Sequence, residues 1–365
     1  MISKPTLLLD ETKCKANIVF MAERAKRFNV ELRPHFKTHQ SLEIGRWFKD
    51  AGVSKITASS LDMASYFSKE WNDITVAFPV NILEIDTIND LASRVTLNIL
   101  IESKTSLEFL KIHLQHPVNF YIKINIGNNR AGLLHYDTES IDTLLEISKN
   151  SDKLNFIGFL SHAGQTYKCR SKADIIRVHE EAKKKLVTLK NQYITNYPEI
   201  IASYGDTPSC SVSENFEGID EIRPGNYAFY DMMQVQIGSC NVNDIAVALE
   251  CPIVAIHPKQ SEVVIYGGGI HLSKDRMEDE SFGTIYGNIA KKTSNSWNEL
   301  IANTYVRAIS QEHGIVKVPE SDITKYKVGD TLLVLPVHSC MTANLMKHYT
   351  TLEGKGITMM NNLNN

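Results

Sequence analysis

The chain has 365 residues, of which 43% are hydrophobic and 22% are charged, and its 39 basic and 42 acidic side chains leave a net charge of −3. This near-neutral balance gives no indication of a nucleic-acid partner or of an anionic membrane surface. Because a single hydrophobic core rarely grows beyond roughly 250 to 300 residues, we expect two domains.

The N-terminal segment MISKPTLLLDETKCK contains an apolar run that is too short and too acidic for a signal peptide. No other stretch approaches the ~20 apolar residues of a membrane span. The six cysteines are scattered without a CxxC pair, which indicates reduced thiols. We therefore expect a soluble, cytoplasmic protein.

Eight β-like segments recur through the first two thirds of the chain, with amphipathic helical stretches such as 10–28, 41–52 and 142–151 between them. The eight segments are 31–37, 55–60, 74–79, 95–103, 119–127, 154–164, 199–206 and 221–229. Strands that alternate with helices at this spacing favour βα units and a parallel sheet. Eight such units predict closure into a (β/α)8 barrel, which we place at residues 12–240.

After about residue 240 the chain becomes strand-rich, with segments such as IAVALECPIVAIHP, EVVIYGGGI and TLLVLPVHSC separated by turns. This pattern predicts a second, mainly antiparallel β domain at residues 241–365. The opening segment TLLLD has no helix before it, so we assign residues 1–11 to the same β domain.

A lysine, Lys37, stands between His35 and His39 in the segment RPHFKTHQ, at the C-terminal end of the first barrel strand. In barrel enzymes that rim carries the chemistry. A lysine amine in a partly dry site has a lowered pKa and can form a Schiff base with an aldehyde. Strand alternation would direct His35 and Lys37 to the same side. From the spacing alone, an ordinary surface lysine is the alternative.

Polar segments that contain glycine stand at the ends of four further strands. They are GNNRAG (127–132), SHAGQTY (161–167), YGDTPS (204–209) and RPGNYAFYD (223–231). Exposed backbone N–H groups at such termini can hold a phosphate. Each segment alone is also a common turn, so it is their shared place at successive strand ends that indicates a binding site.

In this order, the segments RPHFKTHQ, GNNRAG, HAG, GDTPS, RPGNYAFYD, EHG and PVHSC resemble the fold-type III pyridoxal-phosphate enzymes of the D-serine dehydratase and D-threonine aldolase family, whose barrel is alanine racemase-like. The resemblance implies that Lys37 carries pyridoxal 5′-phosphate. It also implies that Arg130 meets the phenolic oxygen or the ring side of the cofactor, and that His162 lies against the pyridine ring. The other cofactor-binding residues that it implies are Tyr167 and, around the phosphate, Gly205, Thr207, Gly225 and Asn226.

A candidate metal site lies late in the chain, where LLVLPVHSC ends in His338 and Cys340. The spacing of two places both side chains on one face of a strand, and an imidazole and a thiolate are preferred zinc ligands. Two ligands are fewer than usual, and a buried cysteine beside a structural histidine is the alternative. The resemblance implies a divalent metal here: zinc, with manganese or magnesium as alternatives.

The resemblance implies a metal-dependent lyase that acts on D-3-hydroxy amino acids and eliminates water, which gives a keto acid and ammonia. Aldol cleavage to glycine and an aldehyde is the alternative, but Gln165 stands where some aldolase-type members have an imidazole, and Asn125 replaces a residue that is often acidic. An amino-acid racemase would not need the metal, and a non-catalytic pyridoxal-phosphate carrier would not need the second domain. The resemblance also implies a homodimer; we expect no partner beyond the small D-amino acid, and neither nucleic acid nor membrane.

Overall fold

The computed structural model describes residues 2–149, 151–293 and 295–361. Within these residues the chain forms two compact units. The barrel unit comprises residues 19–37 and 45–225, and the β unit comprises residues 2–18, 38–44 and 226–361. The chain therefore passes from one unit to the other directly after Lys37 and directly after Gly225.

The barrel unit is built on eight parallel strands, as predicted. They are β2 (Glu31–Leu32), β3 (Ile56–Ala58), β4 (Asp73–Pro79), β5 (Thr96–Ile101), β6 (Val118–Asn125), β8 (Leu154–Ser161), β9 (Ile201–Tyr204) and β10 (Glu221–Ile222). Their hydrogen-bonded order is β2-β10-β9-β8-β6-β5-β4-β3, and the short β7 (Leu133–Leu134) pairs with β6. A parallel bridge between His35 and Thr57 joins the two ends of this order, which closes the barrel.

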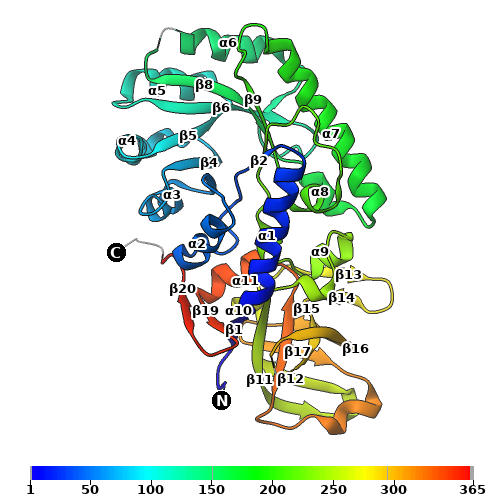
Figure 1. Cartoon of the computed structure of the whole chain (residues 1–365). Coiled ribbons are helices and arrows are strands. Elements are labelled where there is room, and N and C mark those ends of the chain that lie inside the picture. Colours follow the sequence, from blue (N-terminus) through cyan, green and yellow to red (C-terminus); the bar gives the residue numbers. More distant parts are fainter. Residues whose placement is uncertain (1, 150, 294, 362–365) are drawn as a thin grey trace. The chain divides into compact units, whose positions relative to one another are not determined.

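Helices alternate with these strands and cover the outside of the barrel (Figure 1). They are α1 (Glu11–Arg27), α2 (Leu42–Asp50), α3 (Leu61–Phe67), η1 (Ile82–Glu84), α4 (Ile85–Ala92), α5 (Lys104–His113), α6 (Thr138–Lys149), η2 (Gly164–Lys168), α7 (Lys172–Tyr193) and α8 (Thr207–Val212). A serine is the N-cap of three of them: the hydroxyls of Ser60, Ser103 and Ser171 each accept a backbone N–H from the first turn of the following helix. This capping satisfies donors that the helix itself leaves unpaired.

The two-residue strand β2 is held in the barrel by a buried arginine. The Arg33 guanidinium lies 2.6 Å from Glu221 on β10 and 2.6 Å from Asp73 on β4. Only 3% of the Arg33 and Glu221 side chains is exposed. Removing one partner of a buried ion pair leaves an uncompensated charge. The ion pairs of Arg33 with Glu221 and Asp73 therefore hold β2 to β10 and β4.

The β unit is a mainly antiparallel sheet, as predicted. Its strands are β1 (Thr6–Leu9), β11 (Val247–His257), β12 (Glu262–Tyr266), β15 (Gly287–Lys292), β16 (Trp297–Ile309), β17 (His313–Lys317), β18 (Thr331–Pro336), β19 (His348–Thr351) and β20 (Gly356–Thr358). The order is β12-β17-β16-β15-β18-β11-β1-β19-β20, and β12 also pairs with β11, so six strands form a closed ring. The opening strand β1 pairs with β11 in this sheet, with Leu7 opposite Leu249.

Short helices and one hairpin complete the β unit. They are η3 (Asn226–Ala228), α9 (Met232–Ile237), η4 (Val242–Asp244), η5 (Pro258–Gln260), α10 (Gly269–Leu272), η6 (Glu320–Lys325) and α11 (Ser339–Met346), with β13 (Met277–Asp279) and β14 (Gly283–Ile285) as the hairpin. The helix α10 packs against α11, where the Thr342 hydroxyl donates to the Leu272 carbonyl at 3.2 Å.

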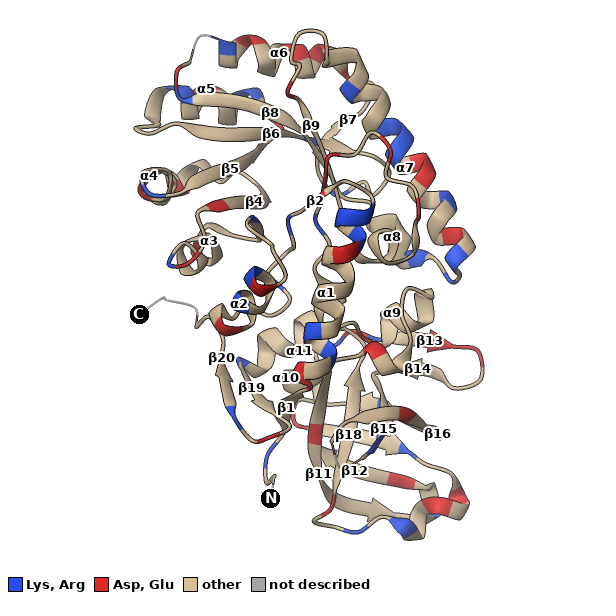
Figure 2. Ribbon diagram, in the orientation of Figure 1, with Lys and Arg blue, Asp and Glu red and all other residues tan. Residues whose placement is uncertain are grey.

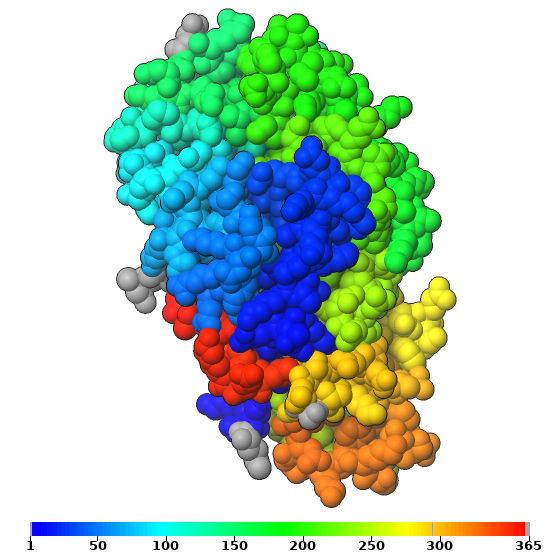
Figure 3. Space-filling model, viewed as in Figure 1, coloured from blue at the N-terminus to red at the C-terminus, as the bar shows by residue number. Residues whose placement is uncertain are grey.

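Charges of both signs are interspersed on the surface, as along α7 in Figure 2. There Arg177 pairs with Glu181 at 3.1 Å. On α1, Arg24 donates to the Cys210 carbonyl and pairs with Glu214. In Figure 3 the dark blue surface of the first residues of the chain borders green surface, which belongs to residues near 200. Among the described residues, no helix combines the length and the apolarity that crossing a membrane requires.

Candidate active site

The segment after β2 presents Lys37 at the C-terminal rim of the barrel. Phe36 is fully buried, with ring centroids 4.9 Å from Phe48 and 5.1 Å from Trp71, so it anchors the segment to the helix layer. Lys37 itself is exposed, and its backbone N–H donates to Nδ1 of His35 at 3.4 Å. The barrel therefore fixes the backbone on the N-terminal side of Lys37 while the amine stays accessible.

Basic groups from several strand ends act on one another at this rim. They are His35, Lys37, Lys123, Arg130, His162 and Arg223. Burial, followed by the charges of Lys37 and Arg223, holds the pKa of His35 well below its ordinary value. Burial, followed by Arg223 and Arg130, lowers the pKa of Lys123 to about 7. Several positive charges that lower one another's pKa values in this way favour the binding of an anionic ligand.

His162 follows β8 and is held in one tautomer. Its Nδ1 lies 2.6 Å from the Gly205 carbonyl oxygen, and because a carbonyl only accepts, Nδ1 carries the hydrogen. Burial, followed by the charge of Lys123, holds the pKa of His162 well below its ordinary value, so the ring is neutral. The Tyr167 ring centroid is 6.3 Å away. That His162 and Tyr167 contact the cofactor stays a prediction.

The region predicted to hold the phosphate brings β9 and β10 very close together. A Cβ on Gly205 would lie 2.9 Å from the backbone nitrogen of Arg223, so only glycine fits there. Thr207 is 1% exposed, and among the residues that the structure describes its Oγ1 is buried without a hydrogen-bond partner. A hydroxyl left unpaired in this way is unfavourable unless a ligand satisfies it.

Asp206 caps the N-terminus of α8 beside this hydroxyl. Its Oδ1 accepts the backbone N–H of Ser209 at 2.7 Å and the hydroxyl of Thr166 at 2.9 Å. Burial raises the pKa of Asp206 to about 6, although these hydrogen bonds oppose the rise. The carboxylate therefore fixes the first turn of α8, which begins at Thr207.

The loop that carries Arg130 is organised by Asn125. Its Oδ1 accepts the backbone N–H groups of Gly127 and Asn129, at 3.0 and 3.1 Å. Gly132 has φ +104 and lies so close to Asn125 that a Cβ would be 2.8 Å from its nitrogen. The Asn125 side-chain amide thus shapes the loop that carries Arg130.

Sequence reasoning missed Arg223 and Lys123 as members of the site. Arg223 is 6% exposed and donates from Nη2 to the Ser161 carbonyl at 2.5 Å and from Nη1 to Ser203. Lys123 is also 6% exposed and lies on β6. A signal was present: Lys123 and Arg223 each stand within a predicted barrel strand, in FYIKINI and EIRPG, where burial of a charged side chain is unfavourable unless it is paired or functional.

In the β unit, His338 and Cys340 come together at the start of a helix. The strand β18 ends at Pro336, His338 is the N-cap of α11, and Cys340 lies in its first turn. The expectation that both residues extend a strand and share its face is therefore wrong, because the chain has already turned into a helix. Their side chains nevertheless interact, and Cys340 is 7% exposed.

Besides His338, the side chains of Thr38 and Asn226 contact the thiol of Cys340. The Thr38 Oγ1 lies 3.3 Å from Sγ, and the Asn226 Nδ2 lies 3.4 Å from it. Asn226 also donates to Asp231 at 2.7 Å and to the Ser339 hydroxyl at 3.0 Å. The side-chain nitrogen of Asn226 is therefore used at the candidate metal site, and the contact of Asn226 to a phosphate stays a prediction.

The His338 imidazole faces carboxylates as well as the thiol. Its Nδ1 lies 3.5 Å from Asp275 Oδ2. Burial lowers the pKa of His338, but Asp275, Cys340 and Asp231 outweigh burial and raise it to about 11. A site that attracts a proton so strongly between a carboxylate and a thiol also attracts a metal cation. No cluster of three or more His, Cys, Asp or Glu side chains arranged for a metal occurs in the described part of the chain.

The residues present fit both groups that the resemblance implies. The basic rim, the accessible Lys37 amine and the unpaired Thr207 hydroxyl suit an anionic aldehyde with a phosphate. The imidazole of His338 and the thiol of Cys340 suit zinc, and two protein ligands would leave positions for water or substrate. The individual contacts to either group stay predictions.

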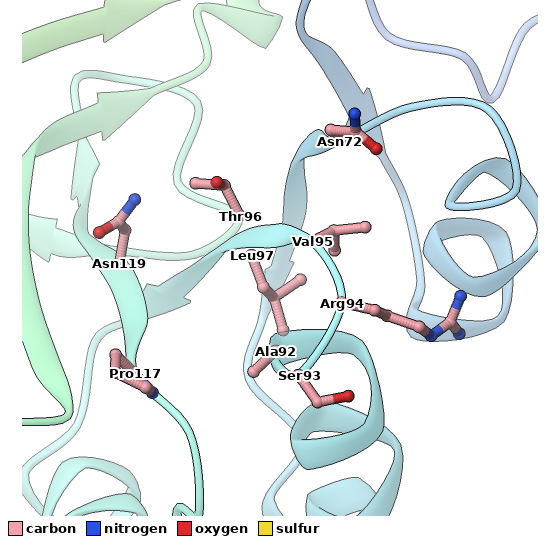
Figure 4. A pocket seen from close by; sticks show the side chains of 9 residues that line it. All are labelled: Asn72, Ala92, Ser93, Arg94, Val95, Thr96, Leu97, Pro117 and Asn119. Carbon is pink, nitrogen blue, oxygen red and sulfur yellow. The ribbon is translucent and has the colours of Figure 1, made fainter.

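A hollow at the opposite end of the barrel is not suited to chemistry (Figure 4). It has a volume of about 490 Å³ and is lined by Asn72, Ala92, Ser93, Arg94, Val95, Thr96, Leu97, Pro117 and Asn119. These residues precede or begin β4, β5 and β6, at the rim that is structural in barrel enzymes. Its arginine, Arg94, is engaged by Asp90 at 2.9 Å.

Comparison with known proteins points in one direction. Residues 9–232 match the family described as "Alanine racemase, N-terminal domain", and residues 246–352 match "Putative serine dehydratase domain". D-serine dehydratase of Dictyostelium discoideum is 30% identical, with 96% of this chain and 94% of that protein covered.

Solved structures agree in fold. The D-threo-3-hydroxyaspartate dehydratase of Delftia sp. HT23 has a TM-score of 0.89 at 23% identity and covers 99% of this chain and 98% of its own. A cysteine-to-alanine variant of that enzyme is in a metal-free form. D-threonine aldolase of Filomicrobium marinum has a TM-score of 0.81 at 19% identity, with 98% of this chain and 94% of that chain covered.

Proposed function

The chain belongs to the alanine racemase-like, pyridoxal-phosphate-dependent family that includes the D-serine dehydratases, and we propose that it is a metal-dependent D-serine dehydratase. It would convert D-serine, or a related D-3-hydroxy amino acid, to the keto acid and ammonia. The water lost from the β-carbon is regained when the nitrogen is released, so D-serine gives pyruvate and ammonia in balance.

The contact between Thr38 and Cys340 carries this proposal. Thr38 Oγ1 lies 3.3 Å from Cys340 Sγ, and Thr38 follows Lys37 directly in the chain. The candidate metal ligand therefore contacts the residue that follows the candidate cofactor lysine in the sequence. A dehydratase needs this combination, because a base must act at the α-carbon while an acid acts on the hydroxyl of the neighbouring carbon.

Different residues of the chain would bind the cofactor, accept the α-proton and bind the metal. Pyridoxal phosphate, when bound, supplies an electron sink for the substrate's α-carbon, and the metal supplies a Lewis acid for its β-hydroxyl. Lys37 would hold the cofactor and accept the α-proton. Arg130 and Arg223 would neutralise anionic oxygens, and Thr207 would donate to the phosphate. His338 and Cys340 would hold the metal.

Gln165 favours dehydration over aldol cleavage. Aldol cleavage requires a base that removes the proton of the β-hydroxyl, and an amide cannot serve as one. Gln165 is instead directed at the loop after β6, where a Cβ on Gly127 would lie 3.0 Å from its Nε2. The thiol at Cys340 supports the same choice, because soft thiolate ligands favour zinc over magnesium or manganese.

We further propose that the protein is a cytoplasmic homodimer with zinc as its metal. None of the six cysteines, all of which lie in the described part of the chain, forms a disulfide, which suits a reducing compartment. The homodimer rests on the family resemblance.

The decisive experiment combines spectroscopy with product analysis. Purified protein incubated with pyridoxal phosphate should show a near-visible absorbance band that borohydride removes, and Lys37→Ala should lack it. The surface variant Lys104→Ala, on α5, is the matched control and should behave as the wild type. D-serine should give pyruvate and D-threonine should give 2-oxobutanoate, and removal of the metal with a chelator should abolish both.

Other products would point elsewhere. Glycine and acetaldehyde from D-threonine would show an aldolase, and interconversion of D- and L-serine would show a racemase. A wild-type protein without the borohydride-sensitive band would refute the whole proposal.

A further inference from the structure

We propose that Asp275 is a positioning residue for the metal-binding imidazole of His338, which rests on the proposed function of His338 and Cys340. Asp275 Oδ2 lies 3.5 Å from Nδ1 of His338, and about a third of each side chain is exposed. A carboxylate on Nδ1 fixes the rotation of the imidazole ring and leaves Nε2 for the metal.

Asp275 is itself held in place by its own loop. The Ser273 hydroxyl donates to Asp275 Oδ2 at 2.7 Å and accepts the backbone N–H of Asp275 at 3.1 Å. Ser273 has φ 69, which ends α10 and turns the chain sharply. The carboxylate is therefore directed before any metal binds, because both its backbone and its side chain are tied to one hydroxyl.

The loop of Asp275 is also tied to the helix that begins at His338. Thr342 on α11 donates to the Leu272 carbonyl on α10 at 3.2 Å, and Thr342 is fully buried. Asp275 and His338 thus lie on two segments that one buried hydrogen bond joins. A displacement of either segment would break this bond as well as the ion pair.

The other carboxylate near His338 is committed to a different task. Asp231 is 1% exposed and accepts through Oδ2 from Asn226, at 2.7 Å, and from the backbone of Ser339, at 3.0 Å. Its Oδ1 accepts the backbone N–H of Gln234. Asp231 therefore caps α9 and secures the start of α11, whereas Asp275 is free to act on the imidazole.

The orientation of His338 matters because only two protein ligands are proposed for the metal. A metal held by one imidazole and one thiolate depends strongly on the orientation of each. Removing the partner of a metal-binding histidine commonly weakens metal affinity by about 10- to 100-fold. We therefore expect Asp275→Ala to weaken zinc affinity by about that factor and Asp275→Asn, which keeps an acceptor oxygen without the charge, to lie between the wild type and Asp275→Ala.

The test measures metal binding directly, without activity. Zinc is titrated into metal-free protein in competition with a chromophoric chelator, for the wild type, both Asp275 variants and Ser273→Ala. Ser273→Ala should show a smaller loss than Asp275→Ala. The control is Asp279→Asn on β13, whose carboxylate accepts the backbone N–H groups of the turn residues Ser281 and Phe282 and should leave affinity unchanged.

Cobalt spectra separate orientation from ligation. Cobalt(II) substituted for zinc reports coordination number through its visible absorption. With Asp275 as a positioning residue, the cobalt spectrum of Asp275→Ala keeps the wild-type coordination number while affinity falls. A changed coordination number would show that Asp275 is a ligand and would overturn the proposal.

A second result would also overturn it: Asp275→Ala that is folded by circular dichroism and binds zinc within about threefold of the wild type, below the range typical of such partners. His338→Ala distinguishes this failure from failure of the proposed function. If His338→Ala loses zinc while Asp275→Ala keeps it, the metal site stands without Asp275. If His338→Ala keeps zinc, the metal site itself is wrong.

Discussion

The hydroxyl of Thr38 lies 3.3 Å from the Sγ of Cys340, although 302 residues separate them. Asn226 approaches the same sulfur at 3.4 Å. Thr38 directly follows Lys37, and Asn226 directly follows Gly225, so each contact comes from a residue next to a predicted cofactor contact. Donors directed at a sulfur stabilise its thiolate form, which is the form that binds metal.

Thr38→Val should weaken metal binding without disturbing the fold. Valine has the shape of threonine but cannot donate to Cys340, and one hydrogen bond is worth about 1 kcal/mol, or roughly fivefold in affinity. Thr38→Ser keeps the hydroxyl and is the matched control. Zinc titration of the two metal-free variants checks this. Equal losses in both would show that the threonine methyl group, rather than its hydroxyl, matters.

Lys123 should titrate close to neutral pH. Burial and the charges of Arg223 and Arg130 lower its pKa to about 7, so Nζ should change its NMR shift near that pH in protein labelled with ¹⁵N-lysine. Lys123→Met should remove the signal and so assign it. Arg223→Met should raise the pKa, because one source of repulsion is lost. An unchanged midpoint in Arg223→Met would contradict the proximity of these two charges.

The alternation of strands and helices predicted the parallel sheet, and the strand-rich segments after residue 240 predicted the antiparallel one, but neither pattern gave the lengths of the strands. The segments predicted at 31–37 and 221–229 form ladders only at β2 and β10, two residues each. Each contains a proline, Pro34 or Pro224, which has no N–H to add to a ladder. The chain still continues alongside its neighbours, since His35 donates to the Pro224 carbonyl at 2.9 Å.

Candidate site residues could be named from the sequence where a motif and a strand end coincide, as at Lys37 and His162, and their contacts to a cofactor stay predictions. Arg223 and Lys123 escaped notice because a basic residue in an apolar strand has no visible partner until the barrel closes. Asp275 escaped for a related reason: 63 residues separate it from His338, and only the packing of α10 on α11 brings them together.

The stability of the apoprotein should fall as pH rises towards 6, through Asp206. Burial raises its pKa from 3.8 to about 6, so between these values the folded protein holds a proton that the unfolded chain has lost. The contribution is fully present below pH 3.8 and is lost by about pH 6, a change of about 3 kcal/mol at about 1.4 kcal/mol per pH unit. Urea unfolding of the wild type and of Asp206→Asn at pH 5 and pH 7 checks this: the difference between the two pH values should shrink in Asp206→Asn. An undiminished difference would assign the effect to another group.

Gly205→Ala should damage both the fold and the cofactor site. The new Cβ would lie 2.9 Å from the backbone nitrogen of Arg223 and 3.0 Å from its carbonyl carbon, so β9 or β10 must shift. We expect unfolding free energy to fall by about 1 to 3 kcal/mol, the range for overpacking. The same shift should move Thr207 and weaken pyridoxal-phosphate affinity roughly tenfold, about 1.4 kcal/mol.

Gly269→Ala is the matched control for this substitution, because its Cβ would meet the Ser310 carbonyl oxygen at an ordinary 3.4 Å. Urea unfolding and a cofactor titration, followed by absorbance, measure the two effects of Gly205→Ala separately. A stable Gly205→Ala with weakened cofactor binding would place the phosphate beside Gly205 directly. A destabilised variant that keeps its cofactor affinity would show that the phosphate lies elsewhere, because the ends of β9 and β10 would have shifted without weakening cofactor binding.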